Sequence, residues 1–324
     1  MNKHPLTYSG FEPPYAPQKW KSHPGALETH NCYTYMLNDL EADERNGHKP
    51  QPGEYAARTN KHLQKIISKI SRLDCGVQQS VILDNANVKI IPLSKGEKYK
   101  CKKNHYKGFL MISPQRDYHF ARQDNRMVPV YREIEKQIRQ GKLIFPKDPK
   151  KIQKLFNSLC DKKIPEIVKL SGSTPGQNSR KRLANILKFS KIWSHKPGSS
   201  YVTDKDGNGN YILNPSEASW DFSRKSGINY SVNCCYFEIP TNSFAQTRST
   251  GVQGFKVNSP HDVRKDLGIN TLDSKYEKLV ESLTNPNKSM KFIIKSLAFA
   301  HANNIRSKTN HKMAASGKVL TSRK

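Results

Sequence analysis

The sequence predicts an α+β fold, in which helices pack on an antiparallel sheet. Three short runs rich in β-branched and aromatic residues, at 88–93, 106–112 and 231–240, are typical of strands. The second run is followed by Ser113-Pro114-Gln115-Arg116 and a further strand-like segment, which predicts a hairpin. Apolar residues at helical spacing between positions 55 and 73, and again between 130 and 187, predict helices with one buried face.

The charge of the chain indicates a polyanionic partner. The 324 residues include 55 lysines and arginines against 27 acids, a net charge of +28. Nucleic acid is the commonest partner of such a chain, because binding to phosphates releases counterions. We find no run of eighteen apolar residues and no apolar core of a secretory signal near Met1, so we expect no membrane partner and no secretion. The expected location is a cytoplasm, a nucleus or a particle assembled there.

The pattern of composition divides the chain into five parts. Proline and aromatic residues without periodicity predict an extended arm over 1–28. The strands and the first helices predict a core over 29–124 and 193–245. Residues 125–192 contain 17 lysines and arginines against 5 acids and predict a basic helical insertion. A helical extension over 250–305 and a basic, disordered tail over 306–324 complete the chain.

The cysteines predict neither a metal site nor a disulfide framework. None of the six has the paired spacing of a zinc site, so we expect no metal, no cofactor and six reduced thiols. Cys234 and Cys235 are expected to lie in the core on opposite faces of their strand.

Cys32 is the candidate nucleophile. Thr29 or Asn31 can cap a helix that places Cys32 in its first turn. A thiol attacks carbonyl groups as the thiolate, and a helix N-terminus and a nearby imidazole both lower the pKa of a thiol. His119, on the strand after the hairpin turn, can act as the base that takes the proton and later returns it to a leaving amine.

A third group must orient the His119 ring, and the sequence offers three candidates. His195 follows Trp193 and Ser194 and precedes the turn residues Pro197 and Gly198, so a hydrogen bond from a neutral His195 to His119 would serve. Asp117 and Asp124 flank the His119 strand and are alternatives, although they are also ordinary turn and strand-end residues. Taken alone, Cys32 is also consistent with a buried core thiol. His23 and His30 either shape the entrance to the site or lie on the surface.

A second candidate site is a nucleic-acid contact within the insertion. Its best cluster is at the expected start of a helix and comprises Arg180, Lys181, Arg182 and Lys188. Such clusters also occur as solvated faces without a partner.

Five segments together resemble a poorly characterised family found in large DNA viruses and some microbes, which in turn is similar to papain-like cell-wall peptidases and cysteine, histidine-dependent amidohydrolases. These segments are Asn31-Cys32-Tyr33-Thr34-Tyr35-Met36-Leu37-Asn38, Pro50-Gln51-Pro52-Gly53, Asp117-Tyr118-His119-Phe120-Ala121-Arg122-Gln123-Asp124, Trp193-Ser194-His195-Lys196-Pro197-Gly198 and Asn233-Cys234-Cys235-Tyr236-Phe237. The resemblance covers roughly residues 29 to 124 and 193 to 240, and the basic insertion departs from the family pattern.

The resemblance implies a papain-like core and a cysteine peptidase or amidase of a giant virus. It implies Cys32 as nucleophile, His119 as base and His195 as the third member, with a location in the host cytoplasm, a viral factory or the virion. Its substrate would be a protein or another amide, and its basic parts would contact nucleic acid or another polyanion. The alternative is a non-catalytic structural or nucleic-acid-binding virion protein on the same scaffold.

Overall fold

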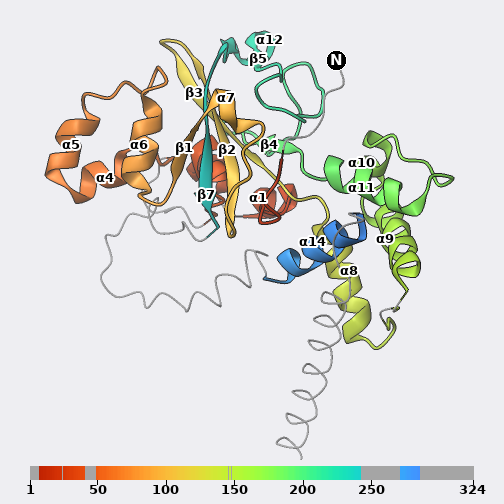
Figure 1. The fold of residues 1–324 in the computed structure, drawn as a ribbon. Helices are drawn as coiled ribbons and strands as arrows, with labels where there is room; N and C mark the ends of the chain where they lie inside the picture. The colour runs from red at the N-terminus through yellow and green to blue at the C-terminus, as the bar shows by residue number, and fades with distance from the viewer. Residues whose placement is uncertain are drawn as a thin grey trace, which may run out of the picture. The chain divides into compact units, whose positions relative to one another are not determined.

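The computed structural model describes residues 7–23, 25–40, 49–144, 146, 148–241 and 271–284. These residues divide into two compact units (Figure 1). The first contains 7–128, 187–241 and 271–274, and the second contains 129–186 and 275–284. Among the described residues, no helix combines the length and apolar character needed to cross a membrane.

The first unit is built around a five-stranded antiparallel sheet in the order β1-β7-β2-β3-β4 (Figure 1). Its strands are β1 (Lys89–Pro92), β2 (His105–Ser113), β3 (Asp117–Gln123), β4 (Trp193–His195) and β7 (Val232–Pro240). The predicted hairpin is present, since β2 pairs with β3 through a turn in which Gln115 has a left-handed φ of 59°. Mixed helix and antiparallel sheet agree with the predicted α+β class.

The sheet separates two apolar clusters, as expected from the alternation of side chains along a strand. Tyr118 and Phe120 of β3 join the cluster that contains Cys32, Tyr33 and Met36 of α3 (Cys32–Met36). The opposite cluster is formed by Ile91, Phe109, Met111, Ala121, Trp193, Ile212, Trp220 and Tyr236. Helix α3 therefore packs on one face of the sheet only.

Several helices of the first unit differ from the sequence-based prediction. The arm expected to be extended contains α1 (Pro17–Ser22) and α2 (Ala26–Thr29). The single helix expected between 55 and 73 is two helices, because Asn60 has an extended backbone and caps the second one. The remaining helices are short: α4 (Glu54–Thr59), α5 (Lys61–Ile67), α6 (Val77–Asp84) and α7 (Leu93–Gly96).

A small two-stranded sheet precedes β7. It consists of β5 (Asp221–Phe222) and β6 (Ile228–Asn229), joined through α12 (Ser223–Ser226). The turn at 206–210 is held by the carboxylate of Asp206, which accepts backbone hydrogen bonds from Asn208, Asn210 and Ser219.

The second unit is helical, in line with the apolar periodicity of its sequence. Its elements are α8 (Val128–Arg139), α9 (Pro149–Lys163), α10 (Pro165–Leu170), α11 (Ser179–Phe189) and α14 (Thr271–Thr284), with Val128, the end of α11 and the start of α14 assigned to the first unit. Its buried side chains include Tyr131 and Tyr276, whose rings stack 5.5 Å apart. The further helix predicted at 289–303 and the tail at 306–324 lie outside the described residues.

The segments that lead into and out of the insertion are hydrogen-bonded to each other. The amide of Asp124 donates to the carbonyl of Ile192, and the amide of Arg126 donates to that of Ser190. β3 and β4 are therefore adjacent, paired strands, although more than sixty residues separate them in the sequence.

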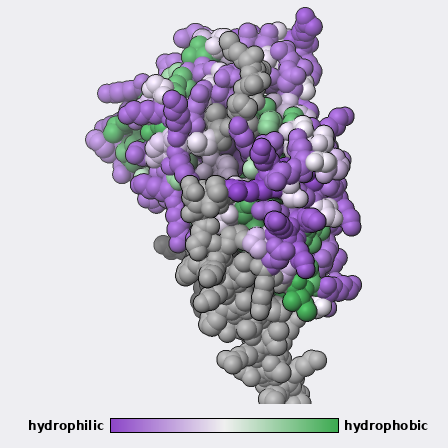
Figure 2. All heavy atoms as spheres, turned by 45° about the vertical axis from the view of Figure 1, so that its right-hand side comes forward, coloured by the Kyte–Doolittle hydropathy of each residue, from purple (hydrophilic) through white to green (hydrophobic). Residues whose placement is uncertain are grey.

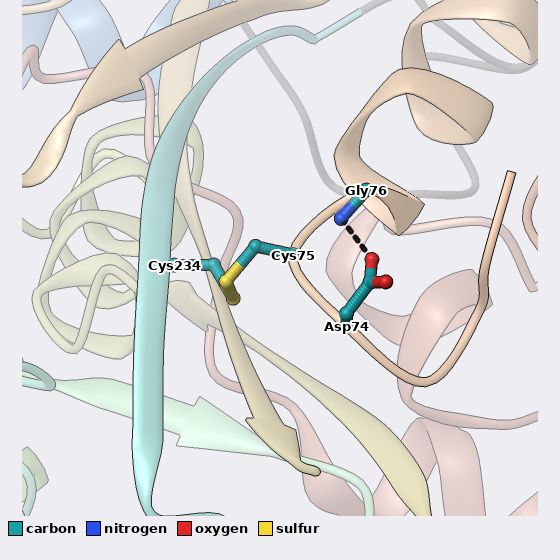
Figure 3. Close-up of a disulfide and its surroundings, with 4 residues drawn as sticks. All are labelled: Asp74, Cys75, Gly76 and Cys234. Atoms are coloured by element: carbon teal, nitrogen blue, oxygen red, sulfur yellow. Dashed lines mark hydrogen bonds between the residues drawn. A yellow bond between two sulfur atoms is a disulfide. The ribbon is translucent and has the colours of Figure 1, made fainter. Parts of the chain in front are cut away.

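A disulfide joins Cys75, in the loop before α6, to Cys234 on β7 (Figure 3). The expectation of six reduced thiols was therefore wrong. The two cysteines lie 159 positions apart and no local pattern links them, but the fold brings their Cα atoms to 5.4 Å, which is disulfide geometry. Cys32, Cys101, Cys160 and Cys235 are free and buried.

Candidate active site

Cys32 lies in the first turn of α3, as predicted. The N-cap is Asn31, whose side-chain oxygen accepts hydrogen bonds from the backbone N–H groups of Tyr33 and Thr34. The backbone N–H of Asn31 donates to the Thr34 hydroxyl. This reciprocal arrangement is a capping box. The cap does not use the amide of Cys32.

The sulfur of Cys32 lies beside β3. β4 pairs with β3 only over Ala121 to Gln123, so β4 leaves the edge of β3 uncovered at Phe120. Cys32 belongs to the same apolar cluster as Tyr118 and Phe120, the two neighbours of His119 on β3. His119 lies on the opposite face of β3, with Ala121, so Cys32 and His119 do not share a face of the sheet.

His119 and His195 are in direct contact. His119 Nε2 and His195 Nδ1 are 2.8 Å apart, on strands where the two residues lie diagonally across from each other on one face. The second nitrogen of His195, Nε2, is 2.9 Å from the carbonyl oxygen of Lys205. The neighbouring strand segment fixes that carbonyl, since Thr203 pairs with His195 and the Lys205 amide donates to Thr203.

These contacts define which nitrogen of His119 carries the free lone pair. A carbonyl only accepts, so His195 Nε2 carries a proton. Burial lowers the pKa of His195 to about 4 and that of His119 well below its usual value, so both rings are neutral at pH 7. His195 Nδ1 then accepts from His119 Nε2–H, and the lone pair of His119 is on Nδ1. The hydrogen bond runs from His119 to His195, opposite to the predicted direction.

The two aspartates considered as alternatives to His195 have other partners. Asp117 accepts hydrogen bonds from the Tyr118 amide and the Tyr230 hydroxyl, both at 2.8 Å. Asp124 pairs with Arg122 and accepts a hydrogen bond from the Ser194 hydroxyl. Of the three candidates, the structure places only His195 against the His119 ring.

Aromatic side chains that sequence reasoning missed enclose the two imidazoles. The ring of Tyr230 stacks on His119 at 5.0 Å, and Trp220 lies 6.0 Å from His119 and 5.3 Å from His195. Phe222 packs on His195 at 5.8 Å. The segment that carries them is about one hundred residues after His119 in the chain, so no local motif connects them. They keep water from the hydrogen bond between the imidazoles.

The pKa of Cys32 does not follow the sequence-based expectation. Burial raises the pKa of Cys32 to about 12, and the negative charge of Asp117 also raises it. The backbone groups of Phe120 and Cys32 and the charge of Lys196 lower this pKa, but by less than burial raises it. The five-residue helix α3 is too short for a strong dipole. At neutral pH the Cys32 thiol and the His119 imidazole are thus both neutral.

The remaining candidate residues do not form one exposed cluster. Arg182 is buried and pairs with Asp161 at 2.5 Å, and Arg180 donates to the carbonyl of Thr284. Lys181 is exposed, and Lys188 is half-buried in the first unit. His30 is fully buried with Trp20 at its edge, so it is not a surface residue. Hydrophilic residues dominate the face drawn in Figure 2.

Comparison of the chain with protein-family models, with curated proteins and with solved structures finds no match. The papain-like relationship therefore stays a prediction. Among the described residues, no group of three or more histidine, cysteine, aspartate or glutamate side chains is arranged to hold a metal ion.

The two neutral histidines give a prediction for stability against pH. Because the pKa of folded His195 is near 4 and that of an unfolded histidine near 6.5, the unfolded chain binds more protons between these values, and stability rises with pH. His195→Gln keeps a donor for Lys205 and an acceptor for His119 but cannot titrate. Between pH 7 and 5 the wild type should lose about 2 kcal/mol more than this variant in urea unfolding. The exposed His62→Gln variant is the control, and equal losses in wild type and His195→Gln would contradict the assignment.

Proposed function

We propose that this protein is a thiol hydrolase that cleaves an amide bond, with Cys32 as nucleophile, His119 as base and His195 as the residue that orients His119. The observation that carries the proposal is the fixed tautomer of His119, whose Nδ1 lone pair is set by the chain of hydrogen bonds to His195 and Lys205. Support also comes from the position of Cys32, in the first turn of a helix that packs on the strand of His119.

The reaction follows from the neutral state of the pair. His119 Nδ1 takes the thiol proton as the Cys32 sulfur attacks the substrate carbonyl, so no isolated thiolate is needed in the buried site. The amide of Cys32, which the helix cap does not use, can donate to the oxyanion that forms. The protonated His119 then gives its proton to the leaving amine. Water, deprotonated by His119, hydrolyses the resulting thioester and regenerates the thiol.

We propose further that the first unit has a papain-like core. Its support is the order of parts: a helix with cysteine in its first turn, packed on an antiparallel sheet whose adjacent strands carry the base and the orienting residue. Peptidase and amidase activity are both compatible with this site.

The burial of Cys32 favours a second candidate function. A thiol that is 5% exposed and has a raised pKa is also what a non-catalytic scaffold would contain. In that case the protein would bind a polyanion through its positive charge, and its affinity would fall steeply with salt.

Acylation of the free cysteines by p-nitrophenyl acetate separates the two functions. Cys101, Cys160 and Cys235 are matched internal controls, because each is buried and burial raises the pKa of each to about 12. The proposal gives Cys32 a general base, His119, and gives the three controls none. We therefore expect the acetylation of Cys32 at pH 7 to be at least about tenfold faster than that of the controls, since general-base assistance contributes about a hundredfold or more. Peptide mass spectrometry of the folded protein measures each site.

The His119→Ala variant is expected to remove this advantage, and Cys32 should then react like the other three cysteines. Equal, slow acetylation of all four thiols in the wild type would overturn the hydrolase proposal and leave the binding protein.

A further inference from the structure

Lys196, which the mechanism above does not use, is a buried cation at the end of β4. Its side chain is 1% exposed, and its ammonium group donates to the carbonyls of His30 at 2.7 Å and Gly198 at 2.8 Å. No carboxylate in the described part of the chain forms an ion pair with it. A buried ammonium without a counter-charge is costly, which indicates that a negative charge forms nearby at some stage.

The geometry places that negative charge at Cys32. Continuing the register of β4 by one residue sets Lys196 opposite Phe120, which belongs to the same apolar cluster as Cys32. The carbonyl of His30 to which Lys196 donates lies directly before Asn31, the cap of the helix that begins at Cys32. The register of the sheet and the hydrogen bond to His30 thus both place Lys196 near the start of this helix.

The charges around both groups are consistent with this pairing. Burial lowers the pKa of Lys196 to about 8, helped by Lys49, while Cys32 and Glu28 raise it. The ionisable groups that act on Cys32 are Asp117 and Lys196, and Cys32 in turn acts on Tyr118 and Tyr230. Lys196 is therefore the cation next to Cys32 in the described residues, and it is mostly protonated at pH 7.

We propose that Lys196 supplies the counter-charge for the negative sulfur of Cys32. The ammonium stabilises the charge that develops on the sulfur when its proton leaves for His119, and again when the thioester breaks down and the thiolate leaves. Lys196 keeps its own proton throughout. It acts on the nucleophile and is distinct from His195, which acts on the base. The role deepens the proposed hydrolase but concerns the ionisation of Cys32, which can be measured without a substrate.

The test is the rate of Cys32 alkylation by iodoacetamide between pH 6 and 10, followed by mass spectrometry. Lys196→Met is expected to slow the reaction about tenfold below pH 8, equivalent to one pKa unit. The difference should fade above pH 8, where wild-type Lys196 loses its own proton. Lys196→Arg should keep the fast reaction up to pH 10, since a guanidinium stays charged.

Lys107→Met is the matched control. Lys107 is also 1% exposed, also donates to two oxygens, of Thr7 and Gly96, and its pKa is also lowered by burial to about 8. Since Lys107 is not among the groups that act on Cys32, its removal should leave the alkylation profile unchanged. Identical profiles for wild type and Lys196→Met would overturn the proposal.

A reciprocal measurement keeps the proposal testable if Lys196→Met does not fold. The pKa of Lys196, followed by NMR of labelled lysine Cε, should be higher in Cys32→Asp, which carries a negative charge at this position, than in Cys32→Ser, because coupling between two sites is mutual. An unchanged pKa would contradict the pairing. Failure of the hydrolase proposal is recognised separately: Cys32 would then show the Lys196-dependent alkylation profile but no preferential acetylation.

Discussion

Asp124→Ala is expected to destabilise the protein by about 3–5 kcal/mol, because it leaves the buried charge of Arg122 without its partner. Both side chains are at most 1% exposed, and Arg122 Nε lies 2.9 Å from Asp124 Oδ1. Arg122 also donates to the carbonyl of Tyr35 and the side chain of Asn38. Burial removes the hydration of both charges, so each charge is stabilised in the core only by its partner. Urea unfolding measures the loss.

Two further variants show whether the loss comes from the unpaired charge. In Arg122→Met/Asp124→Leu both charges are gone, and most of the stability should return. Arg58→Ala removes the exposed pair of Arg58 and Glu54, 3.9 Å apart, and should cost at most about 1 kcal/mol. A loss in Asp124→Ala no greater than in Arg58→Ala would show that the buried pair does not stabilise the core.

The same pair bears on the candidate site. Asp124 accepts a hydrogen bond from Ser194, and the Ser194 hydroxyl lies 2.6 Å from that of Tyr35. Ser194 precedes His195, and Tyr35 belongs to the helix that begins at Cys32. The ion pair thus joins the strand that carries His195 to the helix that begins at Cys32.

Loss of the disulfide between Cys75 and Cys234 is expected to lower the free energy of unfolding by about 5 kcal/mol. The bond closes a loop between residues 159 positions apart, and the entropy removed from an unfolded chain grows with loop length. Cys75→Ser, Cys234→Ser and the double variant should all lose a similar amount, since each breaks the same bond. Urea unfolding of the three variants and of the wild type measures this loss.

Reduction provides the control for the disulfide. A reducing agent should bring the wild type to the level of the variants and leave the double variant unchanged. Additive losses in the double variant, or no effect of reduction on the wild type, would contradict a stabilising role of the bond.

Local signals in the sequence were sufficient for the parts of the site that depend on neighbours in the chain. Short patterns predicted a cap at Thr29 or Asn31, Cys32 in the first helical turn and the turn before His119. The structure has the cap at Asn31 and contains the other two features. The contact between His195 and His119 was a hypothesis from chain order, and the structure contains it.

The parts that could not be predicted depend on residues that meet only in the folded chain. Tyr230 and Trp220 follow the insertion in the sequence but contact His119, which precedes it. Cys75 forms a disulfide with Cys234, 159 positions later. The raised pKa of Cys32 has the same origin, because burial is a property of the packed core and the sequence shows only the helix start.

The place of β7 in the sheet has a consequence for synthesis on the ribosome. β7 is the last strand of the sheet to be made, yet it lies between β1 and β2 and pairs with both. At about 5–20 residues per second, β2 and β3 wait on the order of ten seconds for β7 to emerge. During this interval the edges of β1 and β2 that will pair with β7 have no partner and can bind other chains. The helices of the insertion are made before β7 and can already form. The nascent chain therefore exposes two unpaired strand edges until residue 240 has left the ribosome.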